Sequence, residues 1–228
     1  MGFRDALLDA WALVMPVECA GCEAPDRALC DECSSSLVPL PTPRTTPGRL
    51  QVVTALRYEG TVRRVILSFK EQQRTDAAAH LAPALAAALR TAVDQPGAVE
   101  LAPVPTSRAA FRRRGYDPVR LVMRKAGYRP STVLRVARRT SSQKTLGAAE
   151  RAANLRGALV ARGTLEGRTF AIVDDILTTG ATLDEAARAI TEAGGTVVGG
   201  ATIAFTPRLL SFRDKPSGED YGGAKGAR

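Results

Sequence analysis

The sequence predicts an α/β protein: a parallel sheet with helices on both faces, preceded by a small cysteine-rich unit. Residues 169–205 have the pattern of a strand, a polar loop, a helix and a strand, and both strands are apolar runs. Such runs are typical of parallel strands that are buried on both faces. From residue 50 onward, strand-like and helix-like segments alternate in the same way. All four cysteines lie within the first 33 residues, which indicates a separate N-terminal unit.

The N-terminus predicts a short amphipathic helix. Residues 3–15 are apolar, but Asp5 and Asp9 interrupt the run and no small-residue cleavage site follows, so a signal peptide is disfavoured. No apolar run approaches the ~20 residues of a membrane-spanning helix. We therefore expect a cytoplasmic protein without membrane insertion.

The four cysteines have the spacing C-x2-C-x7-C-x2-C and comprise Cys19, Cys22, Cys30 and Cys33. Each C-x2-C pair forms a tight turn, or knuckle, that carries two thiolates. Two knuckles would present four thiolates to one tetrahedral zinc ion, which gives a closed structural site. Metal binding would then supply folding energy to a segment too short for its own core. Two disulfides are the alternative, and a cytoplasmic location disfavours them.

Composition then divides the chain into four parts. Residues 1–38 hold the N-terminal helix and the knuckle, and residues 39–49 contain four prolines, which predicts a stiff extended linker. Residues 50–205 form the larger domain. Residues 206–228 are rich in Gly, Lys and Asp, and we expect a disordered tail.

Within the larger domain, apolar periodicity and turn residues define the elements. Asp117 followed by Pro118 marks a helix start, and a pair of glycines at 194–195 marks a helix end. Strands are expected at residues 51–58, 99–104, 132–136, 169–173 and 196–205. Helices are expected at residues 61–70, 76–93, 117–126, 148–155 and 181–193.

Charge is concentrated in the middle of the chain. The whole chain carries +9, but residues 101–162 hold 15 basic residues against two acids, a net +13. Such a segment indicates a polyanionic partner, either nucleic acid or a phosphorylated small molecule. A solvated basic face is the alternative.

The polar loop expected at residues 174–180 carries the most informative chemistry. In sheets of this kind, ligands bind beyond the carboxyl ends of the strands. Asp174 and Asp175 could accept hydrogen bonds from vicinal hydroxyls, while Thr178–Thr182 leads into a helix N-terminus that favours a phosphate. Taken alone, Asp174-Asp175 would be consistent with a solvated turn, and Thr178–Thr182 with a loop that caps the helix. Together they predict a sugar-phosphate site.

Residues 170–183 closely resemble the phosphoribosyl pyrophosphate (PRPP) motif of type I phosphoribosyltransferases. Other segments resemble the ComF family, whose named members serve competence and DNA uptake. These are the four cysteines, Tyr58-Glu59-Gly60, Phe69-Lys70, Pro103-Val104-Pro105, Arg112 through Tyr116, Gln143, Arg151 and Asn154-Leu155. The resemblance implies a type I phosphoribosyltransferase fold with an N-terminal zinc knuckle of four cysteines.

The resemblance also implies site residues. Asp174 and Asp175 would be catalytic and would contact the ribose of Mg²⁺-bound PRPP. Its 5′-phosphate would bind Thr178, Thr179, Gly180, Ala181 and Thr182. The pyrophosphate loop would be Val104, Pro105, Thr106, Ser107 and Arg108, and Arg112, Arg113 and Arg114 would add a basic patch. Residues 140–154 resemble a mobile flap.

The resemblance gives no role to two further segments, Lys70 and Tyr116-Asp117-Pro118. Lys70 matches a basic residue of the family, and the resemblance assigns it no function. Tyr116-Asp117-Pro118 departs from the family's usual Phe-Asn-Gln, so no base-recognition or catalytic role is carried over to it.

Three functions follow from these observations. The first is a transferase that moves the phosphoribosyl group of PRPP to an unknown acceptor. The second is a non-catalytic nucleic-acid-binding component of DNA uptake, whose partners would be single-stranded DNA or an uptake helicase. The third is a regulator that senses PRPP. Only three aromatic residues lie in the basic segment, which is sparse for stacking on single strands.

Overall fold

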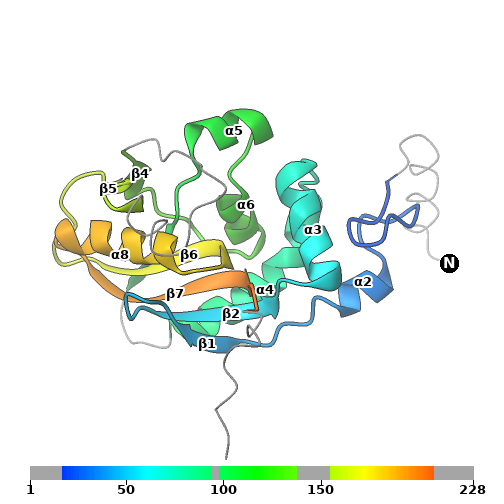
Figure 1. Cartoon of the computed structure of the whole chain (residues 1–228), viewed down its shortest axis with the longest axis horizontal. Coiled ribbons are helices and arrows are strands. Elements are labelled where there is room, and N and C mark those ends of the chain that lie inside the picture. The colour runs from blue at the N-terminus through cyan, green and yellow to red at the C-terminus, as the bar shows by residue number, and fades with distance from the viewer. Residues whose placement is uncertain (1–16, 94–97, 138–154, 208–228) are drawn as a thin grey trace, which may run out of the picture.

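The structure is a computed structural model that describes residues 17–93, 98–137 and 155–207 (Figure 1). The expected helix at 3–15, the flap at 140–154, nearly all of the helix expected at 148–155 and nearly all of the expected tail lie outside the described residues. The elements, in chain order, are α2 (Asp31–Ser35), β1 (Thr42–Thr45), β2 (Gln51–Arg57), α3 (Gly60–Glu71), α4 (Ala77–Ala92), β3 (Val99–Pro103), α5 (Arg108–Arg114), α6 (Pro118–Lys125), β4 (Leu134–Val136), β5 (Leu159–Ala161), β6 (Thr169–Leu177), α8 (Ala181–Glu192) and β7 (Thr196–Phe205).

The main sheet has the strand order β1-β2-β7-β6-β3. Its last four strands are parallel, and β1 is an antiparallel edge strand paired with β2. β4 and β5 form a separate two-stranded sheet. The predicted fold class is confirmed: a mostly parallel sheet with helices on both faces, preceded by a segment in which the four cysteines cluster.

Two hydrophobic clusters cover the two faces of the main sheet. One joins α3, α4 and α6 to the sheet and includes Phe69 and Val173. The other packs α8 and the two-stranded β4–β5 sheet on the opposite face and includes Phe170 and Ile172. Because successive strand residues point to opposite faces, β6 supplies side chains to both clusters. This burial on both sides explains its continuous apolar sequence.

β6 is longer than the sequence indicated. We expected a strand at 169–173 and a polar loop from Asp174, but the strand continues to Leu177. The cause is tertiary, because β7 runs beside β6 and pairs Asp174 with Thr202 and Leu177 with Phe205. The two aspartates therefore lie inside the end of a strand, where the backbone fixes their direction.

The proline-rich segment is part of the sheet. We expected residues 39–49 to be an extended linker, but Thr42–Thr45 forms the edge strand β1, a position that tolerates proline. The turn that follows is held by Asp184 of α8. Its carboxylate accepts hydrogen bonds from the Thr46 hydroxyl and, at 2.9 Å, from the Gly48 N–H. This contact between distant segments could not be predicted from local sequence.

The cysteine-rich segment packs against α3 (Figure 1). Cys33 and Leu37 belong to the same hydrophobic cluster as Val62 of α3. Arg64 of α3 donates a hydrogen bond from Nε to the carbonyl of Gly21. The segment and α3 therefore share one core, so a change in the cysteine-rich segment would be transmitted to α3.

Candidate functional site

Two carboxylates lie at the carboxyl end of β6. Asp174 and Asp175 are both half-buried, and Asp174 Oδ1 accepts a hydrogen bond from the Asp175 N–H at 2.8 Å. Burial and the neighbouring charge of Asp175 raise the pKa of Asp174 to about 8. A buried carboxylate pair of this kind favours a cation or hydroxyl donors close to it.

Lys70, at the C-terminal end of α3, supplies a positive charge to this pair. Its Nζ lies 2.8 Å from Asp175 Oδ2, and the two side chains are only 21% and 16% exposed. An ion pair this enclosed is screened by salt less than a surface pair. Lys70 therefore fixes the carboxylate of Asp175, an arrangement that the resemblance did not provide.

The loop after β6 leads directly into α8. Gly180 precedes the helix with φ +84°, a conformation that favours glycine. A Cβ at this position would lie 2.8 Å from Thr46 Cγ2, so the turn after β1 packs tightly on the loop. The structure thus places Thr178–Thr182 at a helix N-terminus beside the carboxylates. Their binding of a phosphate stays a prediction.

The predicted pyrophosphate loop reaches the same edge of the sheet from β3. The Val104 N–H donates to the carbonyl of Val173 in β6 at 2.9 Å. Ser107 then caps α5, since its hydroxyl accepts a hydrogen bond from a backbone N–H three residues later. Arg108, expected in the loop, is therefore the first residue of a helix. Val104 to Ser107 remain as the connection between β3 and α5.

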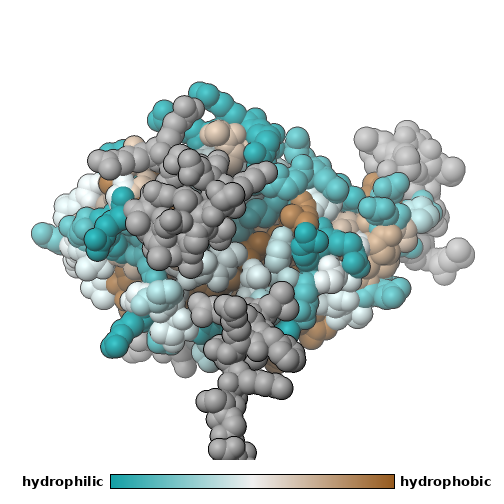
Figure 2. All heavy atoms as spheres, viewed as in Figure 1, coloured by the Kyte–Doolittle hydropathy of each residue, from teal (hydrophilic) through white to brown (hydrophobic). Residues whose placement is uncertain are grey.

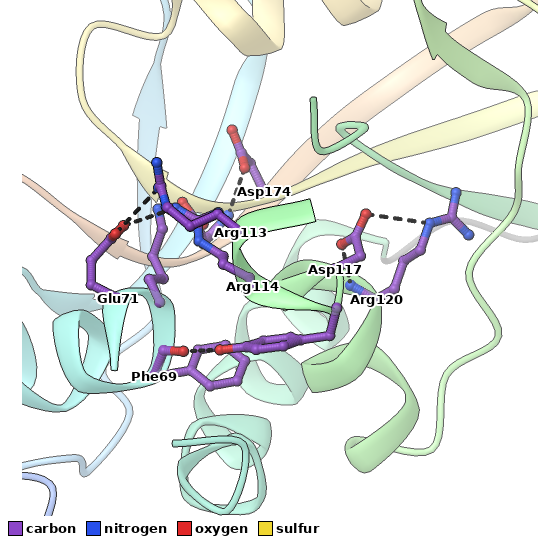
Figure 3. Close-up of polar contacts among 10 residues, drawn as sticks. Phe69, Glu71, Arg113, Arg114, Asp117, Arg120 and Asp174 are labelled. Carbon is purple, nitrogen blue, oxygen red and sulfur yellow. Dashed lines mark hydrogen bonds and ion pairs between the residues drawn. The ribbon is translucent and has the colours of Figure 1, made fainter. Parts of the chain in front are cut away.

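The three consecutive arginines of α5 have different surroundings, and Figure 3 shows Arg113 and Arg114 beside Glu71. Arg113 and Arg114 lie 3.2 and 2.8 Å from the carboxylate of Glu71 at the end of α3. The hydrogen bond from Arg114 lowers the pKa of Glu71. Arg112 is exposed, and no ion pair within the described residues includes it. Two of the arginines therefore attach α5 to α3, and the third is free to meet a ligand.

The residues that depart from the family pattern hold α6 and α3 in place (Figure 3). The Tyr116 hydroxyl donates a hydrogen bond to the carbonyl of Phe69, and the two rings pack at 5.5 Å. The Asp117 side chain caps α6 by accepting from the Arg120 N–H at 3.1 Å. The contacts of Tyr116 and Asp117 therefore show a structural role for each: Tyr116 joins α6 to α3, and Asp117 caps α6.

The four cysteines form one cluster. All four Sγ atoms lie within 4.8 Å of one another, and those of Cys22 and Cys30 are 3.6 Å apart. A disulfide needs ~2.05 Å, whereas zinc at the centre of four thiolates separates them by about 3.8 Å. Burial opposes ionisation of Cys19, but N–H groups of Cys30 and Gly21 donate to its Sγ and lower its pKa to about 6. The donor set and its spacing fit a structural metal site.

Sequence reasoning missed one cavity beside the site. A cavity of about 620 Å³ opens next to Thr178, and Arg44, Arg57 and Phe205 are among the residues that line it. Arg57 and Phe205 end the neighbouring strands β2 and β7, whereas Arg44 lies in the antiparallel strand β1 opposite Val52. The Arg44 side chain reaches the Phe205 ring from there, a contact between distant segments. No local pattern around Arg44 distinguishes it from an ordinary residue of a proline-rich segment.

Comparison with known proteins gives a family for this fold and site. No helix in the described part of the chain is both long and apolar enough to cross a membrane. The chain has no match among curated proteins. The family model described as the phosphoribosyl transferase domain matches residues 81–220, which is more than half of the chain and includes Asp174, Asp175 and Thr178–Thr182. The chain therefore belongs to the phosphoribosyl transferase domain family.

Proposed function

We propose that this protein binds PRPP with Mg²⁺ and transfers its phosphoribosyl group to an acceptor. The observation that supports it best is the arrangement at the end of β6, where the half-buried Asp174–Asp175 pair adjoins a loop that enters α8 through Gly180. The carboxylates would accept hydrogen bonds from the ribose hydroxyls. Amides and hydroxyls of Thr178–Thr182 would hold the 5′-phosphate.

In this proposal the chain positions PRPP and stabilises charge. Asp174 and Asp175 lie where positive charge would develop at C1′ as the bond to pyrophosphate lengthens. The connection from Val104 to Ser107, together with the N-terminus of α5, would hold the departing pyrophosphate. Bound Mg²⁺ would neutralise part of its charge, and oxygen ligands such as these two aspartates suit that ion.

We further propose that the cysteine cluster holds zinc and that the chain is a ComF-type member of its family. Four thiolates at these separations suit a closed, tetrahedral site. Such a site leaves no position for substrate, so zinc would support α3 rather than take part in the reaction. The cluster beside a phosphoribosyl transferase domain supports the ComF assignment.

Calorimetric titration of Mg²⁺-PRPP into the zinc-loaded protein tests the proposed binding. We expect one site per chain and a dissociation constant in the micromolar range, on the order of 8 kcal/mol of binding free energy. Omitting Mg²⁺ should weaken binding, because the carboxylates and the pyrophosphate would then repel each other. No binding at millimolar PRPP would overturn the proposal. Binding without pyrophosphate release with any acceptor would instead favour a PRPP sensor.

A nucleic-acid-binding role in DNA uptake is the second candidate. It is favoured by the outer face of α5, where Phe111 is 48% exposed between the exposed Arg108 and Arg112. Figure 2 shows hydrophilic side chains over this region. An exposed ring flanked by arginines is suited to stacking and phosphate contact.

Fluorescence anisotropy with labelled single-stranded DNA tests this second role. If it is correct, Phe111→Ala should weaken binding roughly tenfold, in line with ~1–3 kcal/mol per stacked base. Arg112→Gln should reduce the dependence of affinity on salt concentration. Equal affinity of wild type and both variants would exclude α5 as the DNA-binding surface.

A further inference from the structure

The cavity beside the loop from β6 to α8 has no acidic side chain among the described residues that line it. It measures about 620 Å³, which is within the range of sites for small molecules. The lining residues come from the ends of β1, β2, β6 and β7: Pro43, Arg44, Thr45, Thr46, Pro47, Arg57, Leu177, Thr178, Thr179, Phe205, Thr206 and Pro207. Two arginines and several hydroxyl groups therefore face this space without a carboxylate among them.

Arg44 is the most unusual of these residues. Its guanidinium carbon lies 3.4 Å from the centre of the Phe205 ring, so one face of the guanidinium is covered. Its Nε is buried without a hydrogen-bond partner, and no ion pair within the described ranges includes Arg44. Burial and the nearby charge of Arg57 lower the pKa of Arg44. A partly desolvated cation without a counter-ion is costly, and a bound anion would offset that cost.

Arg57 lies at the rim of the cavity and contributes less to its positive field than Arg44. It is exposed and pairs with Glu59 at 2.7 Å, so its own charge is largely compensated. Arg44 has no such partner and lies deeper in the structure. A guanidinium presents its donors in a planar fork that matches the two oxygens of a carboxylate or phosphate. The cavity therefore has one specific anchor for an oxyanion, which is Arg44.

The strand order decides which reactant this cavity serves. β3, which leads to the predicted pyrophosphate connection, lies on one side of β6, and β7 and β2 lie on the other. The arginine cavity is lined by β1, by the ends of β2 and β7, and by Leu177 at the end of β6, so it lies on the side of β6 away from β3. A nucleophile attacks C1′ opposite the departing group. The cavity is therefore on the side from which an acceptor would approach.

We propose that this cavity binds the acceptor, and that the acceptor is a small molecule with a carboxylate or phosphate group paired to Arg44. The inference rests on the proposed transfer from PRPP. The nucleophilic atom of the acceptor forms a bond to C1′ while the bond from C1′ to the pyrophosphate oxygen breaks, and pyrophosphate leaves with the electron pair. The attacking atom then releases its proton to solvent.

Binding of matched small probes tests the inference without knowledge of the natural acceptor. Benzoate and benzamide have the same shape and differ in charge, and phenyl phosphate tests the other oxyanion. We expect ligand-observed NMR, in the presence of Mg²⁺-PRPP, to show at least tenfold tighter binding of benzoate or phenyl phosphate than of benzamide. Arg44→Gln should abolish this preference, and Arg44→Lys should retain part of it. Arg90→Gln, an equal charge change at an exposed site on α4, should leave it unchanged.

The outcomes separate this inference from the proposed function. Equal binding of benzoate, phenyl phosphate and benzamide to wild type would overturn the anionic acceptor, even if PRPP binds. A tenfold loss of PRPP affinity in Arg44→Gln, with unchanged probe binding, would make Arg44 a ligand of PRPP and would also overturn it. Failure of PRPP to bind wild type contradicts the proposed function instead. A preference for the anionic probes that depends on Arg44 would still establish the oxyanion subsite in that case.

Discussion

Asp174→Asn is expected to stabilise the metal-free protein while it weakens PRPP binding. Burial and the charge of Asp175 raise the pKa of Asp174 to about 8 from its ordinary value of 3.8. A raised carboxyl pKa means that the unfolded chain loses this proton at lower pH than the folded protein does. Ionisation of Asp174 in the folded protein therefore lowers the free energy of unfolding. This loss is absent below about pH 4, grows as the pH rises, and is complete above about pH 8.

Asp174→Asn should therefore raise the free energy of unfolding at pH 8 by about 1–3 kcal/mol relative to wild type. One pKa unit corresponds to ~1.4 kcal/mol, and the value is reduced because solvent screens the charge of a half-buried group. Urea unfolding at pH 4 and pH 8, without Mg²⁺, measures it. The gain should vanish at pH 4. A destabilised Asp174→Asn at pH 8 would show that the ionised carboxylate is favourable there.

PRPP affinity should change in the opposite direction. Because both carboxylates would bind ribose hydroxyls and favour Mg²⁺, Asp174→Asn/Asp175→Asn should weaken Mg²⁺-PRPP binding by at least about 100-fold, or ~3 kcal/mol. Glu166→Gln is the matched control, because it removes an exposed carboxylate before the opposite end of β6. Calorimetry measures all three proteins. Equal affinity of the double variant and wild type would exclude the carboxylates as the PRPP site.

Removal of the proposed zinc ion is expected to have the largest effect on stability. Cys19 and Cys33 are buried in the cluster that also contains α3, so their ordering and that of α3 depend on each other. Structural zinc supplies ~10–16 kcal/mol in isolated fingers. The rest of this core would remain, so we expect a chelator or Cys33→Ser to lower the free energy of unfolding by more than about 3 kcal/mol.

Denaturant unfolding with and without chelator measures that loss, and Ser34→Ala, an exposed neighbour in α2, is the control. A second readout is PRPP affinity, which should fall because α3 carries Lys70, the partner of Asp175. Stability that responds to a reducing agent and not to the chelator would contradict a zinc site and would favour disulfides.

Local sequence was sufficient for much of the fold. The apolar run at 169–173 and the periodic helix after it require only neighbouring residues to be recognised, and both elements are present. The cysteine spacing likewise predicted a four-thiol cluster, because two knuckles a few residues apart have few other ways to bring their sulfurs together. The fold class and the polar connection from β6 into α8 could therefore be predicted from patterns a few residues long, although the connection begins after Leu177 and not at Asp174.

Tertiary structure alone decided how the site is assembled. The pairs Lys70–Asp175 and Thr46–Asp184 and the contact of Arg44 with Phe205 join segments far apart in the chain. None has a local signal, since each depends on which strands lie side by side and where they end. The extension of β6 to Leu177 has the same origin in its pairing with β7. Short-range patterns determine which elements form. The packing of the sheet edge determines which side chains those elements bring together.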